Sequence, residues 1–286
     1  MLLFAGPGTI SFYILDRIPS PRSYALGEAY AGLDGDPTWL FLNPSSVIDV
    51  STVGFSLLYS YQAGIHQGGG ALLSPVSLKI GDRKIKGNVG VAVGYLYTSE
   101  EAWDQYNEPA GTVTYSESLV ELTAQRTFWG AFNFGFTAKF VNRNIAGYTD
   151  WGVAGDFSAL TAIQGVGVGL VFKNFGYSPG GVLPLSIRIG VGFVPLEIAG
   201  FKLNVALDVS STQNIGFEMG GGVEVSYADM AFVRLGYSTA PSKDVNILSG
   251  MTFGAGVKLS WISFDYALGY HSMLGFAHMA SFSFSR

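Results

Sequence analysis

Residues that could carry out catalysis or bind a metal are few in this chain and widely spaced. Its three histidines are His66, His271 and His278. None of them belongs to a His-x-x-x-His or Glu-x-x-His pattern, which would place two metal ligands on one helical face. Asp265, His271 and Ser272 could form a hydrolytic triad, because such triads are defined by geometry. Residue type alone supports that triad, so we expect no catalytic residue and no metal site.

Glycine runs and cysteines add no further chemistry. The runs 68-GGG-70, 165-GVGVG-169 and 220-GGG-222 lack the Lys-Ser/Thr pair and the following helix of a phosphate-binding loop. We interpret these glycines as easing packing inside the molecule and curvature of a sheet. The chain has no cysteine, which excludes disulfides and thiolate chemistry. No cofactor is expected.

The composition favours a membrane protein. Of 286 residues, 48% are hydrophobic and 13% are charged, about half the charge of roughly 25% in soluble domains. The sequence nevertheless has no run of about 20 apolar residues that would form a membrane helix. A closed β-barrel is the other structure that pairs all of its backbone groups within lipid. The net charge of −5, without a basic patch, argues against nucleic acid as a partner.

The pattern of side chains supports the barrel. In 251-MTFGAGVKLSW-261, apolar residues alternate with polar or small ones, which predicts a strand with one apolar and one polar face. Fourteen such strands are predicted, many about ten residues long, the length that a tilted strand needs to cross a bilayer. They span 51–61, 70–79, 87–98, 113–125, 128–141, 151–160, 165–173, 184–194, 201–210, 217–227, 230–238, 250–260, 263–270 and 275–285.

The connections between these strands alternate in length. Long polar loops are predicted at 99–111, 142–150, 174–183 and 239–249, and short turns at Arg126–Thr127, 161–164 and Ala228–Asp229. The segment 80–87 is long on the short-turn side. This alternation is typical of outer-membrane barrels. We therefore predict an all-β, transmembrane antiparallel barrel in the bacterial outer membrane, with its apolar faces against lipid and lipopolysaccharide.

The first 49 residues do not alternate. They contain helix-like pieces, prolines and turn signals, which predicts a plug or periplasmic segment over 1–49 and a barrel over 50–286. Asp36, Asn43 and Pro44 form either a simple turn or a hinge that opens a route through the barrel. The apolar stretch 38–42 could fill the lumen or line a pocket for an acyl chain. The stretch 1–5 is expected to be the tail of a signal peptide or the start of the mature chain.

Charged side chains are predicted to face the lumen. A salt-bridged interior that holds the plug, or a polar gate or ligand path, would explain them. Six cations and five anions are nearly balanced, which argues against a pore for ions of one sign. The predicted residues are Lys139, Asp156, Lys173, Arg188, Lys202, Asp208, Glu218, Glu224, Arg234, Lys258 and Asp265.

Several short motifs resemble the PorV/PorQ family of outer-membrane proteins, relatives of the FadL fatty-acid transporters. The segment 21-PRSYALGEAYAGLDGDPTWLFLNPSSV-47 is similar to the family's opening, although Ser45 and Ser46 replace an Ala-Gly pair. The segments 168-VGLVFKNFG-176, 183-LPLSIRIGVGF-193 and 264-FDYALGYHSMLGFAHMASFSF-284 resemble motifs of its barrel. The resemblance implies a barrel of 14 strands with an N-terminal plug.

The same resemblance implies two non-enzymatic functions. PorV-like proteins act in type IX secretion, bound to a large translocon or another outer-membrane protein. FadL-like relatives import hydrophobic small molecules such as fatty acids by passive transport. A secretion partner would need an exposed patch on the outer wall, for which the Phe-rich strand 128–140 is the candidate. An importer would need an apolar pocket that connects the lumen to the outside.

Overall fold

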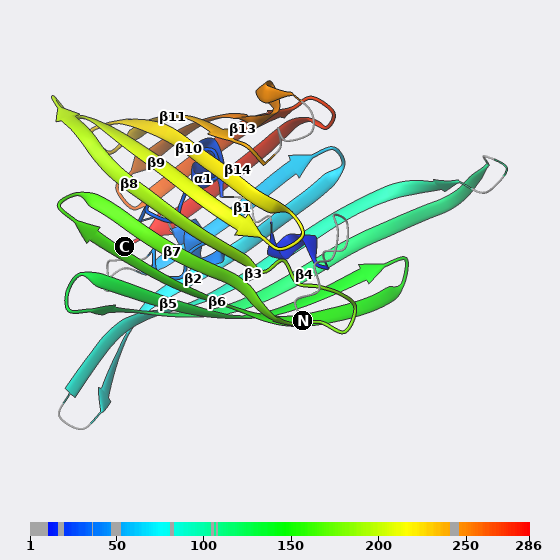
Figure 1. Ribbon diagram of the computed structural model, residues 1–286, viewed down its shortest axis with the longest axis horizontal. Helices are drawn as coiled ribbons and strands as arrows, with labels where there is room; N and C mark the ends of the chain where they lie inside the picture. Colours follow the sequence, from blue (N-terminus) through cyan, green and yellow to red (C-terminus); the bar gives the residue numbers. More distant parts are fainter. Residues whose placement is uncertain are drawn as a thin grey trace.

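The computed structural model describes residues 11–16, 20–35, 37–46, 53–80, 83–103, 106, 108–240 and 246–286. Fourteen antiparallel strands close into a barrel (Figure 1). Each strand pairs with its neighbours in sequence, and β1 (Gly54–Gln62) closes the ring by pairing with β14 (Gly275–Ser285). The predicted fold class and number of strands are confirmed.

The strands between these two vary widely in length. The longest reach 20 and 21 residues, about twice the length that a tilted strand needs to cross a bilayer. Their bounds are β2 (Ile65–Ile80), β3 (Arg83–Trp103), β4 (Pro109–Phe128), β5 (Phe132–Ile145), β6 (Tyr148–Ile163), β7 (Val166–Tyr177), β8 (Ser186–Ile198), β9 (Phe201–Thr212), β10 (Gly216–Tyr227), β11 (Ala231–Ser238), β12 (Met251–Leu259) and β13 (Ile262–His271).

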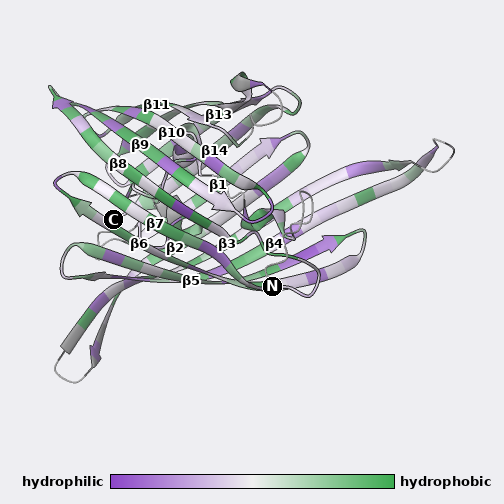
Figure 2. Ribbon diagram, viewed as in Figure 1, coloured by the Kyte–Doolittle hydropathy of each residue, from purple (hydrophilic) through white to green (hydrophobic). Residues whose placement is uncertain are grey.

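The wall has an apolar outer face and a polar inner face. Along β1 every second residue is buried, so Ser56 lies inside while Leu57 is 49% exposed on the outside. In β12, Phe253 and Val257 likewise point outward, and Thr252 is buried. Figure 2 shows the same alternation of apolar and polar residues along the strands. Successive residues of a strand point to opposite faces, so one alternating pattern produces both surfaces.

The barrel has two distinct ends. We call the end where β1 begins and β14 ends the terminal rim, and the opposite end the distal rim. Strands β3 and β4 continue beyond the distal rim as a long hairpin, and β2 and β3 continue beyond the terminal rim (Figure 1). The described parts of the segments predicted as loops at 99–111 and 142–150 are therefore mostly paired strands. That prediction was wrong because polar residues beyond the wall still pair their backbones.

One predicted turn also lies elsewhere. Arg126 and Thr127 belong to β4, and the turn comes at Trp129 and Gly130, where φ is 51° and 70°. Tight hairpin turns of this kind need a positive φ at both central residues. Gly130 adopts it at no steric cost, and Trp129 is a non-glycine residue in the same left-handed region. The sequence rule of a short connection at this rim still holds.

The N-terminal segment lies inside the barrel, where Figure 1 shows it in blue. We call its described residues, 11–16, 20–35 and 37–46, the plug. Its elements are η1 (Tyr13–Leu15), α1 (Pro21–Ala25) and η2 (Pro37–Phe41). The helix α1 contacts β11 to β14, η2 contacts β1 to β3 and β14, and η1 contacts β3 and β4. In the described part of the chain, no helix has the length and apolar character to span a membrane.

The plug packs partly through apolar side chains. Phe12, Ile14, Leu40 and Phe41 are almost fully buried and form one cluster with inward-facing wall residues. Those wall residues are Leu58, Ala71, Leu73, Ala92, Leu96, Leu119 and Val141. Burial of this apolar surface contributes about 25 cal/mol for each Å² removed from water. These leucines interrupt the polar inner face where the plug covers it.

Wall glycines admit the plug backbone at close range. A Cβ atom added to Gly169 would lie 1.7 Å from the carbonyl oxygen of Ala31. One added to Gly220 would lie 2.0 Å from the carbonyl oxygen of Gly27, and one added to Gly236 would lie 2.2 Å from the amide nitrogen of Gly27. No other residue type leaves room for these contacts. The glycine runs at 165–169 and 220–222 thus include positions where the wall touches the plug.

The substitution Gly169→Ala should displace the plug near Ala31 while the barrel stays closed. Overpacking of this kind costs about 1–3 kcal/mol. Limited proteolysis of the folded protein should therefore cleave the plug faster in this variant. Gly68→Ala is the control, because its added carbon would meet the Leu58 carbonyl oxygen at 3.4 Å, an ordinary contact. Equal cleavage of Gly169→Ala and the unaltered protein would contradict the close contact.

Candidate functional site: the plug and its cavity

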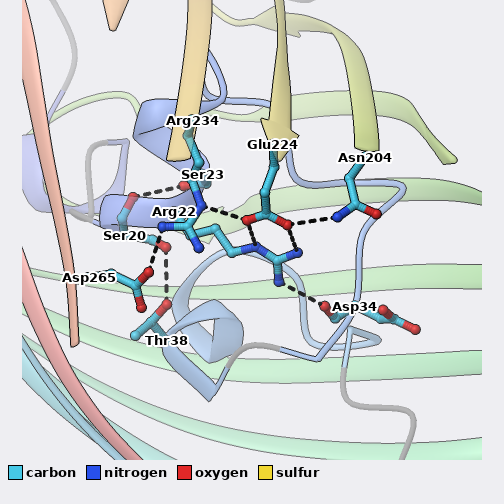
Figure 3. A network of polar contacts seen from close by, with 9 residues as sticks. All are labelled: Ser20, Arg22, Ser23, Asp34, Thr38, Asn204, Glu224, Arg234 and Asp265. Atoms are coloured by element: carbon cyan, nitrogen blue, oxygen red, sulfur yellow. Dashed lines mark hydrogen bonds and ion pairs between the residues drawn. The ribbon is translucent and has the colours of Figure 1, made fainter. Parts of the chain in front are cut away.

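Glu224 of β10 is the centre of one charge cluster between the plug and the wall (Figure 3). Arg22 of α1 donates to both of its carboxylate oxygens, at 3.0 and 2.9 Å. Arg234 donates to Glu224 at 2.6 Å and to Asp265 at 2.5 Å, and Asn204 donates to Glu224 at 3.0 Å. Glu224 is 1% exposed, so its charge is neutralised inside the barrel by one arginine from the plug and one from the wall.

The plug holds α1 in place by its own hydrogen bonds as well. Arg22 donates to the backbone carbonyl of Asp34, and the hydroxyls of Ser20 and Thr38 lie 3.0 Å apart (Figure 3). The Ser23 hydroxyl donates to the Ser20 carbonyl. Arg22 therefore joins two turns of the plug to one carboxylate of the wall.

Asp208 of β9 forms a second contact with the plug. Its Oδ2 accepts the backbone amides of Tyr30 and Ala31, at 2.9 and 3.0 Å. Arg188 lies 3.5 Å from the same oxygen, donates to the Glu28 carbonyl at 2.9 Å and covers the Tyr30 ring at 4.6 Å. Burial raises the pKa of Tyr30 to about 12, so its phenol stays neutral. Asp208 thus supplies the acceptor that two buried plug amides need.

Glu117 of β4 forms a third contact with the plug, which the sequence analysis missed. Its carboxylate accepts the amides of Tyr13 and Ile14 at 2.9 and 2.6 Å, and the Tyr115 hydroxyl also donates to it. Glu117 and Glu121 share the inward parity of β4 with Leu119. Leu119 lies between the two glutamates on the inward face, so this face does not look polar in the sequence. The outward Val120 and Leu122 are the signal that would have assigned both glutamates to the lumen.

A fourth cluster links β4, β5, β6 and β7. Lys139 lies 2.7 Å from Asp156 and 3.3 Å from Glu121, and it donates to Asn174 at 3.2 Å. The backbone N–H of Asn174 donates to Asp156, and the side-chain Nδ2 of Asn174 donates to the carbonyls of Leu15 and Pro184. Asn174 therefore connects this cluster to the plug.

Four other predicted site residues have different surroundings. Lys202 and Lys258 lie at the terminal rim instead of inside the lumen. Lys202 pairs with Asp229 of the turn at 2.8 Å, and Lys258 is exposed. Both lysines occupy strand positions that alternate toward the inside, but they lie at strand ends beyond the plug and are therefore not buried. Glu218 lines a cavity described below, and Asp36 falls outside the described residues.

Asn43 and Pro44 are buried in the plug. The Asn43 side chain accepts the Ser45 amide at 3.1 Å and donates to the Ala31 carbonyl at 3.2 Å. The backbone of Pro44 lies so close to Gly135 of β5 that an added Cβ atom there would be 2.2 Å from the Pro44 carbonyl carbon. The Ser45 backbone amide also donates to the Ser158 hydroxyl of β6. These contacts build a turn that is tied to the wall, and a hinge role for it stays a prediction.

The residues considered for catalysis are not assembled. Asp265 pairs with Arg234, whereas His271 Nδ1 accepts the amides of Met273 and Leu274 in the turn after β13. Asp265 and His271 are six residues apart on one strand, or about 20 Å. Among the described residues, no three His, Cys, Asp or Glu side chains are grouped as a metal site would require.

A cavity of about 120 Å³ lies between the plug and the distal part of the wall. Gln62 at the end of β1, Ile65 at the start of β2, Ser186 at the start of β8 and Thr212 at the end of β9 line it, so it lies on the distal side of the plug. Its apolar and aromatic side chains are Tyr13, Leu15, Tyr24, Tyr30, Leu42, Tyr61, Ile65, Ala277 and Met279. Its charged side chains are Asp16, Glu28, Lys173, Arg188 and Glu218.

Comparison with known proteins shows the fold. No family model matches the chain, and a search of curated proteins finds no match. Among solved structures, the toluene transporter TodX of Pseudomonas putida matches with a TM-score of 0.61 at 10% identity, over 99% of each chain. The chain shares its fold with this transporter. The Ralstonia pickettii toluene transporter TbuX matches with a TM-score of 0.58 at 11% identity, over 93% of this chain and 97% of that one.

These matches show the barrel fold that the sequence resemblance implied. A relationship to PorV or PorQ is not shown by them. At a sequence identity near 10%, the similarity shows a shared fold and does not show a shared ligand. A ligand of this chain is therefore to be inferred from the residues of its own cavity and plug contacts.

The substitution Glu224→Gln should destabilise the protein. It leaves Arg22 and Arg234 without their shared anion, and breaking a buried pair costs about 3–5 kcal/mol. The midpoint of urea unfolding, followed by tryptophan fluorescence in detergent, should fall. The control is Lys202→Gln, which removes an exposed pair at the rim and should leave the midpoint unchanged. Equal midpoints for the two variants would show that the Glu224 cluster does not hold the structure.

Proposed function

We propose that this protein is an integral barrel of the bacterial outer membrane that takes up small hydrophobic molecules by passive transport. The observation that carries the proposal is the partly apolar cavity of about 120 Å³ on the distal side of the plug. A cavity of about 150 Å³ is sufficient to hold benzene. A molecule the size of a single ring therefore suits this site.

The direction of uptake follows from the two rims. Outer-membrane barrels carry short turns on the periplasmic side and longer loops outside. The β3–β4 hairpin extends from the distal rim, whereas five connections at the terminal rim, from β4–β5 to β12–β13, are short. The distal rim then faces outward, and a molecule entering from outside reaches the cavity before the plug.

An open ion channel fits the described residues less well. The plug contacts the inner wall on several sides, and its apolar cluster fills part of the lumen. The buried carboxylates at Glu117, Asp208 and Glu224 hold plug groups and do not form a ring around a water-filled passage. Onward passage of a ligand requires movement of the plug, for which Asp36, Asn43 and Pro44 remain the predicted hinge.

The secretion role implied by the PorV resemblance has no observation in its favour. Its candidate surface was the Phe-rich segment 128–140, of which residues 132–140 belong to β5. Phe132, Phe136 and Phe140 are 41–49% exposed on the outer wall, like Leu57 of β1 and Phe253 of β12. They therefore do not stand out from a wall that is apolar all round. A large translocon as partner stays a prediction from sequence.

Blocking the cavity should stop uptake. Ala277 of β14 lines the cavity and is 2% exposed, so Ala277→Phe should fill it with a ring. Gram-negative cells that express this variant should take up labelled toluene no faster than cells without the protein. Ala280→Phe is the matched control on the same strand, because Ala280 points outward. Uptake by the Ala277→Phe variant at the rate of the control would contradict the proposed route.

A further inference from the structure

Lys173 of β7 has an unusual position for a lysine. The residue is 5% exposed, and its side chain lines the cavity. Within the part of the chain that the structure describes, its ammonium group makes no hydrogen bond and no ion pair within 4.0 Å. A cation removed from water without a partner is costly, and buried charges are normally paired. Its ammonium group therefore remains available to a ligand in the cavity.

An irregularity in the sheet creates this situation. Gly155 pairs with Phe175 and Phe157 pairs with Phe172, so two residues of β7, Lys173 and Asn174, lie opposite Asp156 alone. Both are buried in the lumen, and Asn174 adopts a left-handed φ of 61°. Bulges of this kind redirect side chains.

The nearest carboxylates are already engaged by other groups. Asp156 binds Lys139 at 2.7 Å through Oδ2 and the Asn174 amide through Oδ1. Glu121 lies 3.3 Å from the same lysine. The bulge therefore directs the local anions to Lys139 and Asn174 and leaves Lys173 beside the cavity.

The groups around Lys173 form a donor-rich corner of the cavity. Across the β7–β8 ladder, Ser186 is directly opposite Lys173, and Arg188 lies two residues farther along the same face. Thr212 donates to the Ser186 hydroxyl at 3.0 Å. The acidic residues in the lining, Asp16, Glu28 and Glu218, each have an interaction of their own.

We propose that the cavity binds a small monocarboxylate of about the size of benzoate. Its carboxylate would pair with Lys173 Nζ, and its ring would lie against Leu15, Leu42 and Met279. The volume of about 120 Å³ suits a single ring, because a site of about 150 Å³ holds one. This inference rests on the proposed uptake function and narrows its substrate to an anionic class.

Three probes that share one ring test the charge. Toluene is neutral, benzoate is an anion and benzylammonium is a cation, and binding to the full protein in lipid nanodiscs is measured by calorimetry. Benzoate should bind about tenfold more tightly than toluene, as expected for one charge-assisted hydrogen bond. Lys173→Met should remove that preference, so that benzoate binds no more tightly than toluene. Lys173→Arg should retain the preference, because the cation is kept.

Failure of this inference can be told apart from failure of the proposed function. If toluene binds, and Ala277→Phe abolishes its binding, but benzoate shows no preference, the carboxylate site is overturned and hydrophobic uptake stands. Unchanged benzoate affinity in Lys173→Met would also overturn the site. If none of the three probes binds the unaltered protein, the proposed function itself fails.

Discussion

The structure depends on one constraint: a chain segment inside a closed barrel must find partners for its backbone polar groups. The plug has little regular structure of its own, and several of its backbone amides find their acceptors outside it. The wall supplies the missing partners. Glu117 accepts two plug amides, Asp208 accepts two more, and Glu224 binds the plug arginine. Four lumen charges, those of Glu117, Arg188, Asp208 and Glu224, thus attach the plug to the wall.

The same constraint explains the glycines on the inner wall. Backbone-to-wall contact requires that no side chain intervene, and Gly169, Gly220 and Gly236 provide that space. Both charged acceptors and glycines therefore occur on the surface that the plug covers. Where the plug ends, on the distal side, the wall instead presents Tyr61, Met279 and Lys173 to a cavity. Binding a ligand there requires no break in the attachments of the plug.

Much of the barrel follows from sequence because strand parity is a local property. The outward row of Phe253 and Val257 can be assigned from ten residues without knowledge of any neighbour. The bulge at Lys173 and Asn174 could not be assigned in this way, because it is defined by pairing with β6. The roles of Glu117 and Asp208 depend on where the plug amides lie, which no local pattern specifies. Lys202 and Lys258 were predicted to lie in the lumen because the alternation along a strand shows which face a side chain is on. It does not show how far along the barrel axis the side chain lies.

Hydrogen exchange of the plug amides tests the central claim most directly. The measurement follows the backbone amides of Tyr13, Ile14, Tyr30 and Ala31 by mass spectrometry or NMR in the lipid-embedded protein. If wall carboxylates hold the plug, these amides exchange far more slowly than in an unstructured chain, and Asp208→Asn speeds exchange at Tyr30 and Ala31 but not at Tyr13 and Ile14. Exchange of all four at the rate of an unstructured chain would contradict the account.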